Sequence, residues 1–154
     1  MPAALIDTTV WIAAVFPTHP AHLLAQRHLE RATAAEPAFF CRATQQSFLR
    51  LVSTPALLKM YGVEQAGNRE AIAALQAFEA LAQVRVAEEP AGLVSLWLQL
   101  GATQRPAPKL WMDAYLAAFA ISAALPLLTL DRDFEAFRSA GLRLERLDAA
   151  TEEG

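Results

Sequence analysis

The stretch ALIDTTVWIAAVF at residues 4–16 contains an apolar run, an aspartate with two threonines, and a second apolar run. The run from Ala3 to Ile6 has the length and composition of a buried strand, and Asp7-Thr8-Thr9 supplies the side-chain oxygens that commonly start a helix. This helix is expected to stop before Pro17, because proline cannot continue a regular helix. The stretch therefore predicts a buried strand that leads directly into a helix, with an aspartate where the two meet.

Strands and helices are expected to alternate along the rest of the chain. The helix at residues 64–81 has Ile72, Leu75 and Phe78-Glu79 as its inward stripe, and the proline-rich stretch 101–108 is expected to be a loop. Further strands are expected at Ala38–Cys41, Val84–Val86, Leu127–Leu130 and Leu142–Leu147, and further helices at Pro20–Ala34, Ala43–Ser53, Leu93–Leu100, Leu110–Ala124 and Asp131–Ser139.

This alternation predicts an α/β fold with a mostly parallel sheet of four to five strands and helices on both faces. Hydrophobic residues make up 55% of the chain and charged residues 19%, which is typical of a folded, core-rich domain. One domain over residues 1–148 accounts for the length. Residues 149–154 are expected to form a short polar tail.

Charge and cysteine content narrow the function classes. A net charge of -3 argues against indiscriminate binding of nucleic acid, so any RNA contact must use a local basic patch. The single cysteine, Cys41, cannot form an intramolecular disulfide and supplies no thiolate pair for zinc. With neither a secretory leader nor an apolar stretch long enough to span a bilayer, the chain is expected to act in the cytoplasm, away from membranes.

Three aspartates are expected at the carboxyl edge of the sheet, where α/β proteins bind their ligands. Asp7 ends the first strand, Asp131 ends the strand at 127–130, and Asp113 lies in the first turn of the helix between them. Clustered carboxylates repel one another, so such a group usually holds a cation. Oxygen-only ligation favours Mg²⁺ or Mn²⁺, and ions held in this way suit phosphodiester hydrolysis.

Taken singly, each aspartate has a plainer explanation. All three stand where an N-cap or a first-turn partner of the helix dipole is expected. The structural role and the metal role are about equally supported for any one of them, and only their joint placement favours a metal site.

Four segments, in order, resemble the motif blocks of VapC-type PIN domains, the ribonuclease toxins of type II toxin-antitoxin systems. These segments are LIDTTVW at 5–11, TQQSFLRLVS at 44–53, MDAYLAAFA at 112–120 and TLDRDFEAF at 129–137. The resemblance spans nearly the whole chain. It implies a three-layer PIN fold, with one PIN domain over 1–148, and magnesium-dependent cleavage of RNA.

The resemblance also assigns roles to individual residues. It implies that Asp7, Asp113 and Asp131 bind the metal and that Asp133 is an accessory metal-binding acid. Where many PIN domains have a glutamate, this chain has Gln45. Its amide can still bind the metal or a metal-bound water and so take part in catalysis, but the site loses one negative charge.

Four further residues are candidates for positioning the substrate. Thr8 and Thr9 lie at a helix start, where they would either hold a phosphate or a metal-bound water or simply cap the helix. Arg42 and Arg132 flank the acidic motifs and would suit an RNA backbone, although ordinary surface solvation explains them equally well. The resemblance further implies a homodimer and a VapB-like antitoxin as partner, with a heterotetramer or a larger toxin-antitoxin assembly as the alternative.

Two rivals to this hypothesis remain. One is a PIN-like interaction protein with weak or no catalysis, which is motivated by Gln45. The other is a phosphotransfer protein of the receiver or haloacid-dehalogenase type. The sequence counts against the second, because Thr9 stands where the dehalogenase motif requires a second aspartate.

Overall fold

The structure, a computed structural model, describes residues 1–148 and contains five parallel strands in the order β3-β2-β1-β4-β5. All neighbouring strands are parallel, as predicted. The predicted polar tail, 149–154, lies outside the described residues. The strands are β1 (Ala4–Ile6), β2 (Ala38–Phe40), β3 (Val84–Val86), β4 (Leu127–Thr129) and β5 (Leu144–Arg146).

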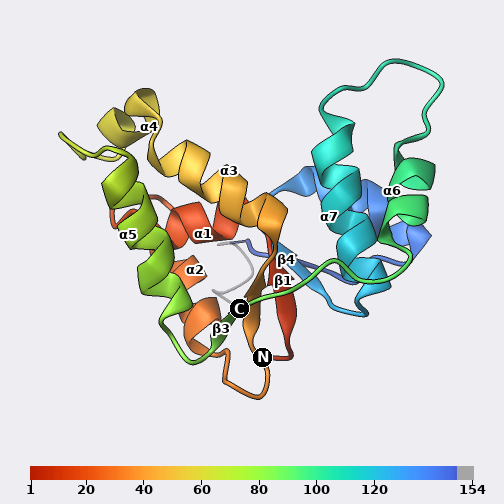
Figure 1. Cartoon of the computed structure of the whole chain (residues 1–154), viewed down its shortest axis with the longest axis horizontal. Coiled ribbons are helices and arrows are strands. Elements are labelled where there is room, and N and C mark those ends of the chain that lie inside the picture. Colours follow the sequence, from red (N-terminus) through yellow and green to blue (C-terminus); the bar gives the residue numbers. More distant parts are fainter. Residues whose placement is uncertain (149–154) are drawn as a thin grey trace.

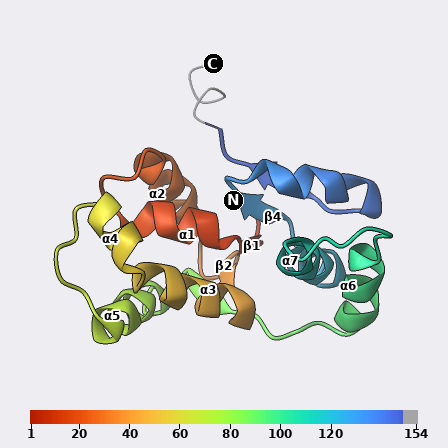
Figure 2. The same ribbon diagram turned by 90° about the horizontal axis from the view of Figure 1, so that it is seen from above.

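Helices cover both faces of this sheet, so the three-layer prediction is confirmed (Figures 1 and 2). One group precedes β3 in the chain and consists of α1 (Thr8–Val15), α2 (His22–Glu30), α3 (Arg42–Val52), α4 (Pro55–Met60) and α5 (Asn68–Glu79). The other group follows β3 and consists of α6 (Leu93–Gly101), α7 (Leu110–Ser122) and the 3-10 helix η1 (Arg132–Ala140).

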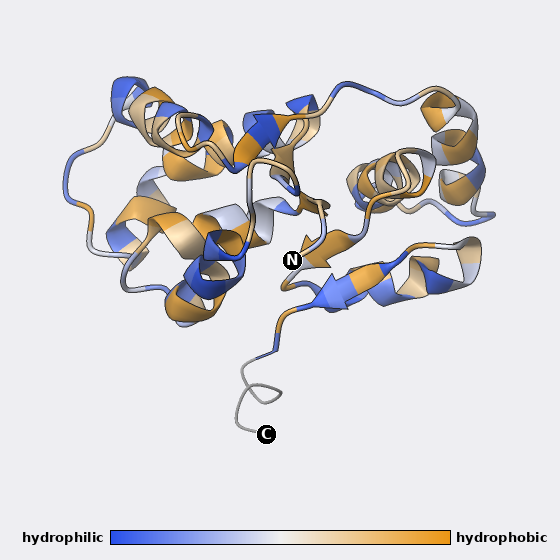
Figure 3. Ribbon diagram, turned by 90° about the horizontal axis from the view of Figure 1, so that it is seen from below, coloured by the Kyte–Doolittle hydropathy of each residue, from blue (hydrophilic) through white to orange (hydrophobic). Residues whose placement is uncertain are grey.

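Alternating side chains of the strands build two separate hydrophobic cores. In β1, Ala4 and Ile6 belong to the core beneath α1–α5, whereas Leu5 belongs to the core beneath α6, α7 and η1. Neighbouring residues of a strand point to opposite faces of the sheet, so both faces become apolar. Hydrophobic residues accordingly run through both groups of helices, while many outer turns are hydrophilic (Figure 3).

Aromatic rings fill the first core. The rings of Trp11 and Phe40, both fully buried, are stacked with centroids 3.9 Å apart. Phe48 and Phe78 pack around Phe40 from α3 and α5. Burial of each such ring contributes about 2–3 kcal/mol, so this cluster fixes α1, α3 and α5 against β2.

The positions of most elements match the prediction, with two differences in the first group of helices. The short helix α4 was missed, although Pro55 at its first turn is a recognised start signal. Ile72 was expected to face inward but is 46% exposed, and Ala71 takes its place in the core beside Leu75. Within residues 1–148, no helix is both long and apolar enough to cross a membrane.

Candidate active site

Asp7 lies directly after β1 with its carboxylate buried. Its Oδ2 accepts hydrogen bonds from the hydroxyls of Thr9 and Thr129, each at 2.7 Å. Asp7 occupies the N-cap position of α1, although its carboxylate makes no side-chain capping hydrogen bond there. Burial raises the pKa of Asp7, the Thr129 and Thr9 hydroxyls oppose that shift, and the negative charge of Asp131 adds to it.

Thr129, the last residue of β4, connects Asp7 to Asp131. Its fully buried hydroxyl donates to Asp7 and accepts from the backbone N–H of Asp131 at 2.9 Å. The Thr9 hydroxyl also accepts from the backbone N–H of Leu130 at 3.2 Å. Sequence reasoning missed Thr129, although a polar residue ending an otherwise apolar buried strand was a usable signal.

Asp131 caps a helix and also lies close enough to two other acids to affect them. Its Oδ1 accepts from the backbone N–H of Asp133 at 2.9 Å and so caps η1. Its charge also acts on both Asp7 and Asp113. Capping fixes Asp131 at the carboxyl end of β4 and leaves its negative charge beside the other acids.

Asp113, in the first turn of α7, shows that the acids converge. Desolvation raises its pKa to about 6, and the negative charges of Asp131, Asp7 and Asp133 add to that shift in that order. Asp133 is exposed and lines the same surface hollow as Asp113, with Lys109 and Arg132 on the rim. The structure therefore brings all four predicted metal-binding acids to one region.

These carboxylates interact electrostatically without forming a coordination cage. Among residues 1–148, no three His, Cys, Asp or Glu side chains are arranged so that together they would hold a metal ion. Coulombic repulsion acts over several ångströms, whereas Mg²⁺ requires oxygens at roughly 2.0–2.1 Å. The donor set is nevertheless the oxygen-only, strongly negative one that suits a hard divalent cation.

Gln45 lies in the first turn of α3 with both ends of its amide engaged. Its Oε1 accepts from Arg42 Nη1 at 2.7 Å, and its Nε2 donates to Glu79 Oε1 at 2.6 Å. The side chain is buried, and Glu79 is not among the charges that shift the pKa of Asp113. Gln45 therefore connects α3 to α5 and orients Arg42.

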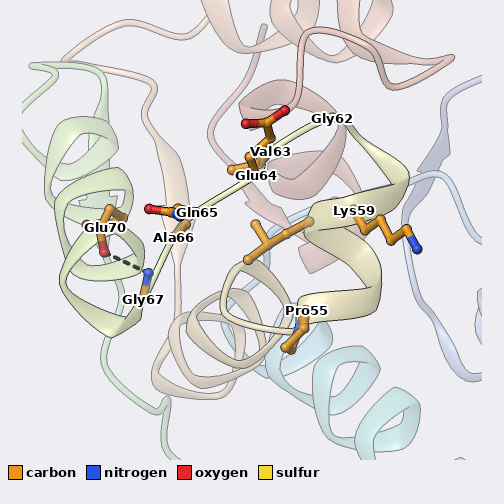
Figure 4. Close-up of a pocket in the computed structure, with 10 residues that line it drawn as sticks. Pro55, Lys59, Gly62, Val63, Glu64, Gln65, Ala66, Gly67 and Glu70 are labelled. Carbon is orange, nitrogen blue, oxygen red and sulfur yellow. Dashed lines mark hydrogen bonds between the residues drawn. The ribbon is translucent and has the colours of Figure 1, made fainter.

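The remaining predicted residues occupy different surroundings. Thr8 is buried, and its backbone N–H lowers the pKa of Asp7. Arg42 is exposed at the start of α3, and Arg132 borders the hollow beside Asp113. Another hollow, of about 870 Å³, lies between α4 and α5 and is larger than the hollow that contains Asp113 (Figure 4). Lys59, Glu64 and Glu70 are among its lining residues, but none of the four acids borders it.

The chain matches the PIN domain family over residues 4–139. It belongs to the PIN-domain family. Within that family it is 42% identical to ribonuclease VapC41 of Mycobacterium tuberculosis over 141 residues, which cover 91% of this chain and 97% of the relative. This likeness places the chain in the VapC group of PIN domains.

Solved structures show the same PIN fold. VapBC2 of Rickettsia felis, bound to a DNA fragment from its promoter, aligns with a TM-score of 0.64 at 14% identity, covering 95% of this chain and 99% of the other. VapC20 of M. tuberculosis, a toxin that cleaves the sarcin-ricin loop, aligns with a TM-score of 0.63 at 21% identity, covering 94% and 100%. At these identities the likeness concerns the fold alone.

The raised pKa of Asp113 leads to a prediction about stability. Asp113 binds its proton more tightly in the folded PIN domain than in the unfolded chain, where the pKa of this carboxyl is near 3.8. Its contribution to stability is therefore present at acid pH and lost as the pH rises through about 6. Asp113→Asn is expected to stabilise the metal-free protein by about 1 kcal/mol at pH 8, after discounting for solvent screening of a half-buried group, and hardly at pH 4.

Urea unfolding of both proteins in the presence of a chelator measures this difference. Glu145→Gln, which neutralises an exposed acid on β5, serves as the control and should change stability little at either pH. A stability difference between wild type and Asp113→Asn that stays constant from pH 4 to pH 8 would contradict the electrostatic coupling.

The bonds of Gln45 lead to a second prediction. Gln45→Glu replaces the amide that donates to Glu79 with a second carboxylate facing it, so we expect a loss of about 1–3 kcal/mol at pH 8. The loss should shrink near pH 4, where a protonated carboxyl can donate again. Gln46→Glu, at the neighbouring exposed position, is the matched control in the same unfolding measurement and should be nearly neutral.

Proposed function

We propose that this PIN-domain protein is a Mg²⁺- or Mn²⁺-dependent endoribonuclease. The observation that carries the proposal is the convergence of four acids, which raises the pKa of Asp113 to about 6 through burial and through three neighbouring negative charges. VapC41, the relative that is 42% identical, is named as a ribonuclease. PIN-domain ribonucleases are generally dependent on divalent metal ions.

Asp7, Asp113 and Asp131 would hold the ion, with Asp133 as an accessory acid. When bound, the ion supplies an activated water and stabilises charge on the phosphodiester. Asp7 is oriented by the Thr9 and Thr129 hydroxyls, so its carboxylate keeps one orientation. Ordering a carboxylate before the reaction lowers the entropic cost of reaching the transition state.

The cationic residues near the acids would position the RNA backbone. Lys109 and Arg132 border the hollow that contains Asp113 and Asp133, where they oppose the negative charge that would otherwise repel a phosphate. Gln45 contributes to catalysis as a positioning residue, because its Oε1 holds Arg42 at the start of α3. Thr8 contributes through its backbone N–H, which acts on Asp7.

The same proposal includes a toxin role. Solved structures with this fold include VapBC complexes from Rickettsia felis, Haemophilus influenzae and Salmonella typhimurium. By analogy, the chain forms a homodimer in the cytoplasm and is held inactive by a VapB-like antitoxin, in a heterotetramer or a larger assembly. The alternative is an interaction protein with weak catalysis, which Gln45 and the absence of a formed cage in residues 1–148 would favour.

Cleavage of RNA by the purified protein tests the enzymatic proposal. We expect cleavage with Mg²⁺ or Mn²⁺, none with a chelator, and a fall of at least about a hundred-fold in Asp7→Asn, since the ion contributes several kcal/mol to the transition state. Glu145→Gln should cleave like the wild type. Failure of the wild type to cleave RNA at any concentration of either metal would establish the interaction-protein alternative.

Induced expression in a bacterial host tests the toxin role separately. The wild type should arrest growth, and co-expression of the small gene adjacent to its own should relieve the arrest by forming a complex that can be purified. Asp113→Asn should permit growth while still forming that complex. Arrest that persists in Asp113→Asn would show that toxicity does not depend on the acid cluster.

A further inference from the structure

A second hollow, of about 380 Å³, lies between the loop at 101–108 and the first turn of α7. Its lining includes Gly101, Arg105, Pro106, Pro108 and Trp111. Trp111 lies in the first turn of α7, two residues before Asp113, and its side chain is 44% exposed. Lys109 and Leu110, at the start of the same helix, border the hollow that contains Asp113. The first turn of α7 therefore lines both hollows, with Trp111 and Asp113 on opposite sides of it, because residues two apart in a helix point in nearly opposite directions.

The Trp111 ring is held firmly although nearly half of it is exposed. The Trp97 indole N–H donates to the Trp111 backbone carbonyl at 2.9 Å, and the two rings make an edge-to-face contact with centroids 6.2 Å apart. A Cβ at position 101 would lie 2.5 Å from the Trp111 ring. Only glycine therefore lets the ring pack against α6, and Trp111 presents a pre-ordered aromatic surface.

Cationic side chains line both hollows. Arg105 lines the hollow of Trp111, while Lys109 and Arg132 line the hollow of Asp113. In a chain with a net charge of -3, cations on both sides of the first turn of α7 favour an anionic ligand. Single-stranded nucleic acid is recognised by this combination, in which aromatic side chains stack on unpaired bases and cations contact the phosphates.

We propose that Trp111 is a stacking platform for an unpaired base of the RNA, on the other side of the first turn of α7 from the acid cluster. This rests on the proposed ribonuclease function and assigns to it a residue that contacts a base. Arg105 neutralises the phosphate beside the stacked base, and Lys109 contacts the backbone where it approaches Asp113. Trp111 positions the substrate through its base, while the acids act on the backbone.

Binding of a short, unstructured RNA of mixed sequence by the purified full-length protein, measured by fluorescence anisotropy in a chelator, tests the platform without cleavage. Trp111→Ala should bind roughly ten-fold more weakly, and Trp111→Phe, which retains a ring, should recover most of that loss. Met112→Ala is the matched control, because Met112 is a neighbouring apolar residue with 45% exposure. It should bind like the wild type.

The same RNA with abasic residues separates stacking from backbone contacts. All four proteins should bind it equally, because it has no base to stack on Trp111. In cleavage assays, Trp111→Ala should raise KM for intact RNA and leave kcat near that of the wild type. If no protein cleaves RNA but the binding pattern is as described, the ribonuclease proposal fails and the platform stands.

Three outcomes overturn the platform. In the first, Trp111→Ala binds intact RNA as tightly as the wild type. In the second, it weakens binding of intact and abasic RNA equally, which would indicate a general disturbance of the surface. In the third, sedimentation shows that Trp111→Ala dissociates a dimer while each subunit keeps its affinity for RNA, which would make Trp111 a contact between two copies of the chain.

Discussion

The buried carboxylate of Asp7 is the constraint around which this edge of the sheet is built. A negative charge in an apolar interior is costly unless hydrogen bonds stabilise it, and here two threonine hydroxyls approach the same oxygen. One hydroxyl comes from α1 and the other from the end of β4. These bonds also fix the position of Asp131, because the Thr129 hydroxyl accepts a hydrogen bond from the backbone N–H of Asp131.

Much of the fold was accessible from sequence, because apolar runs and helical periodicity report burial directly. The five strands were recognised from their apolar runs. The convergence of Asp7, Asp113 and Asp131 could be expected because two of these acids follow neighbouring parallel strands and the third begins the helix that leads into β4. The missed helix α4 is short and has little periodicity to detect. Ile72 was assigned to the core because hydrophobicity was taken as a sign of burial, yet the helix α5 turns Ala71 inward.

The finer features of the site required coordinates, because they depend on contacts between distant segments. Thr129 lies 122 residues from Asp7, and nothing local indicates that its hydroxyl would find that carboxylate. Gln45 is a similar case. The sequence shows only an amide at a position where the family resemblance implied a glutamate, whereas the structure shows a partner, Glu79, that accepts a hydrogen bond from this amide. The missing charge at 45 is thus explained by a charge 34 residues away.

The two separate hydrophobic cores have a further consequence. Asp7 belongs to the half of the molecule that contains α1–α5, and Asp113 belongs to the half that contains α6 and α7, so the acid cluster spans the seam between them. A divalent ion bound there would join the halves across the sheet. By mass action, the cohesion of the two halves would then vary with the concentration of free ion in the surroundings.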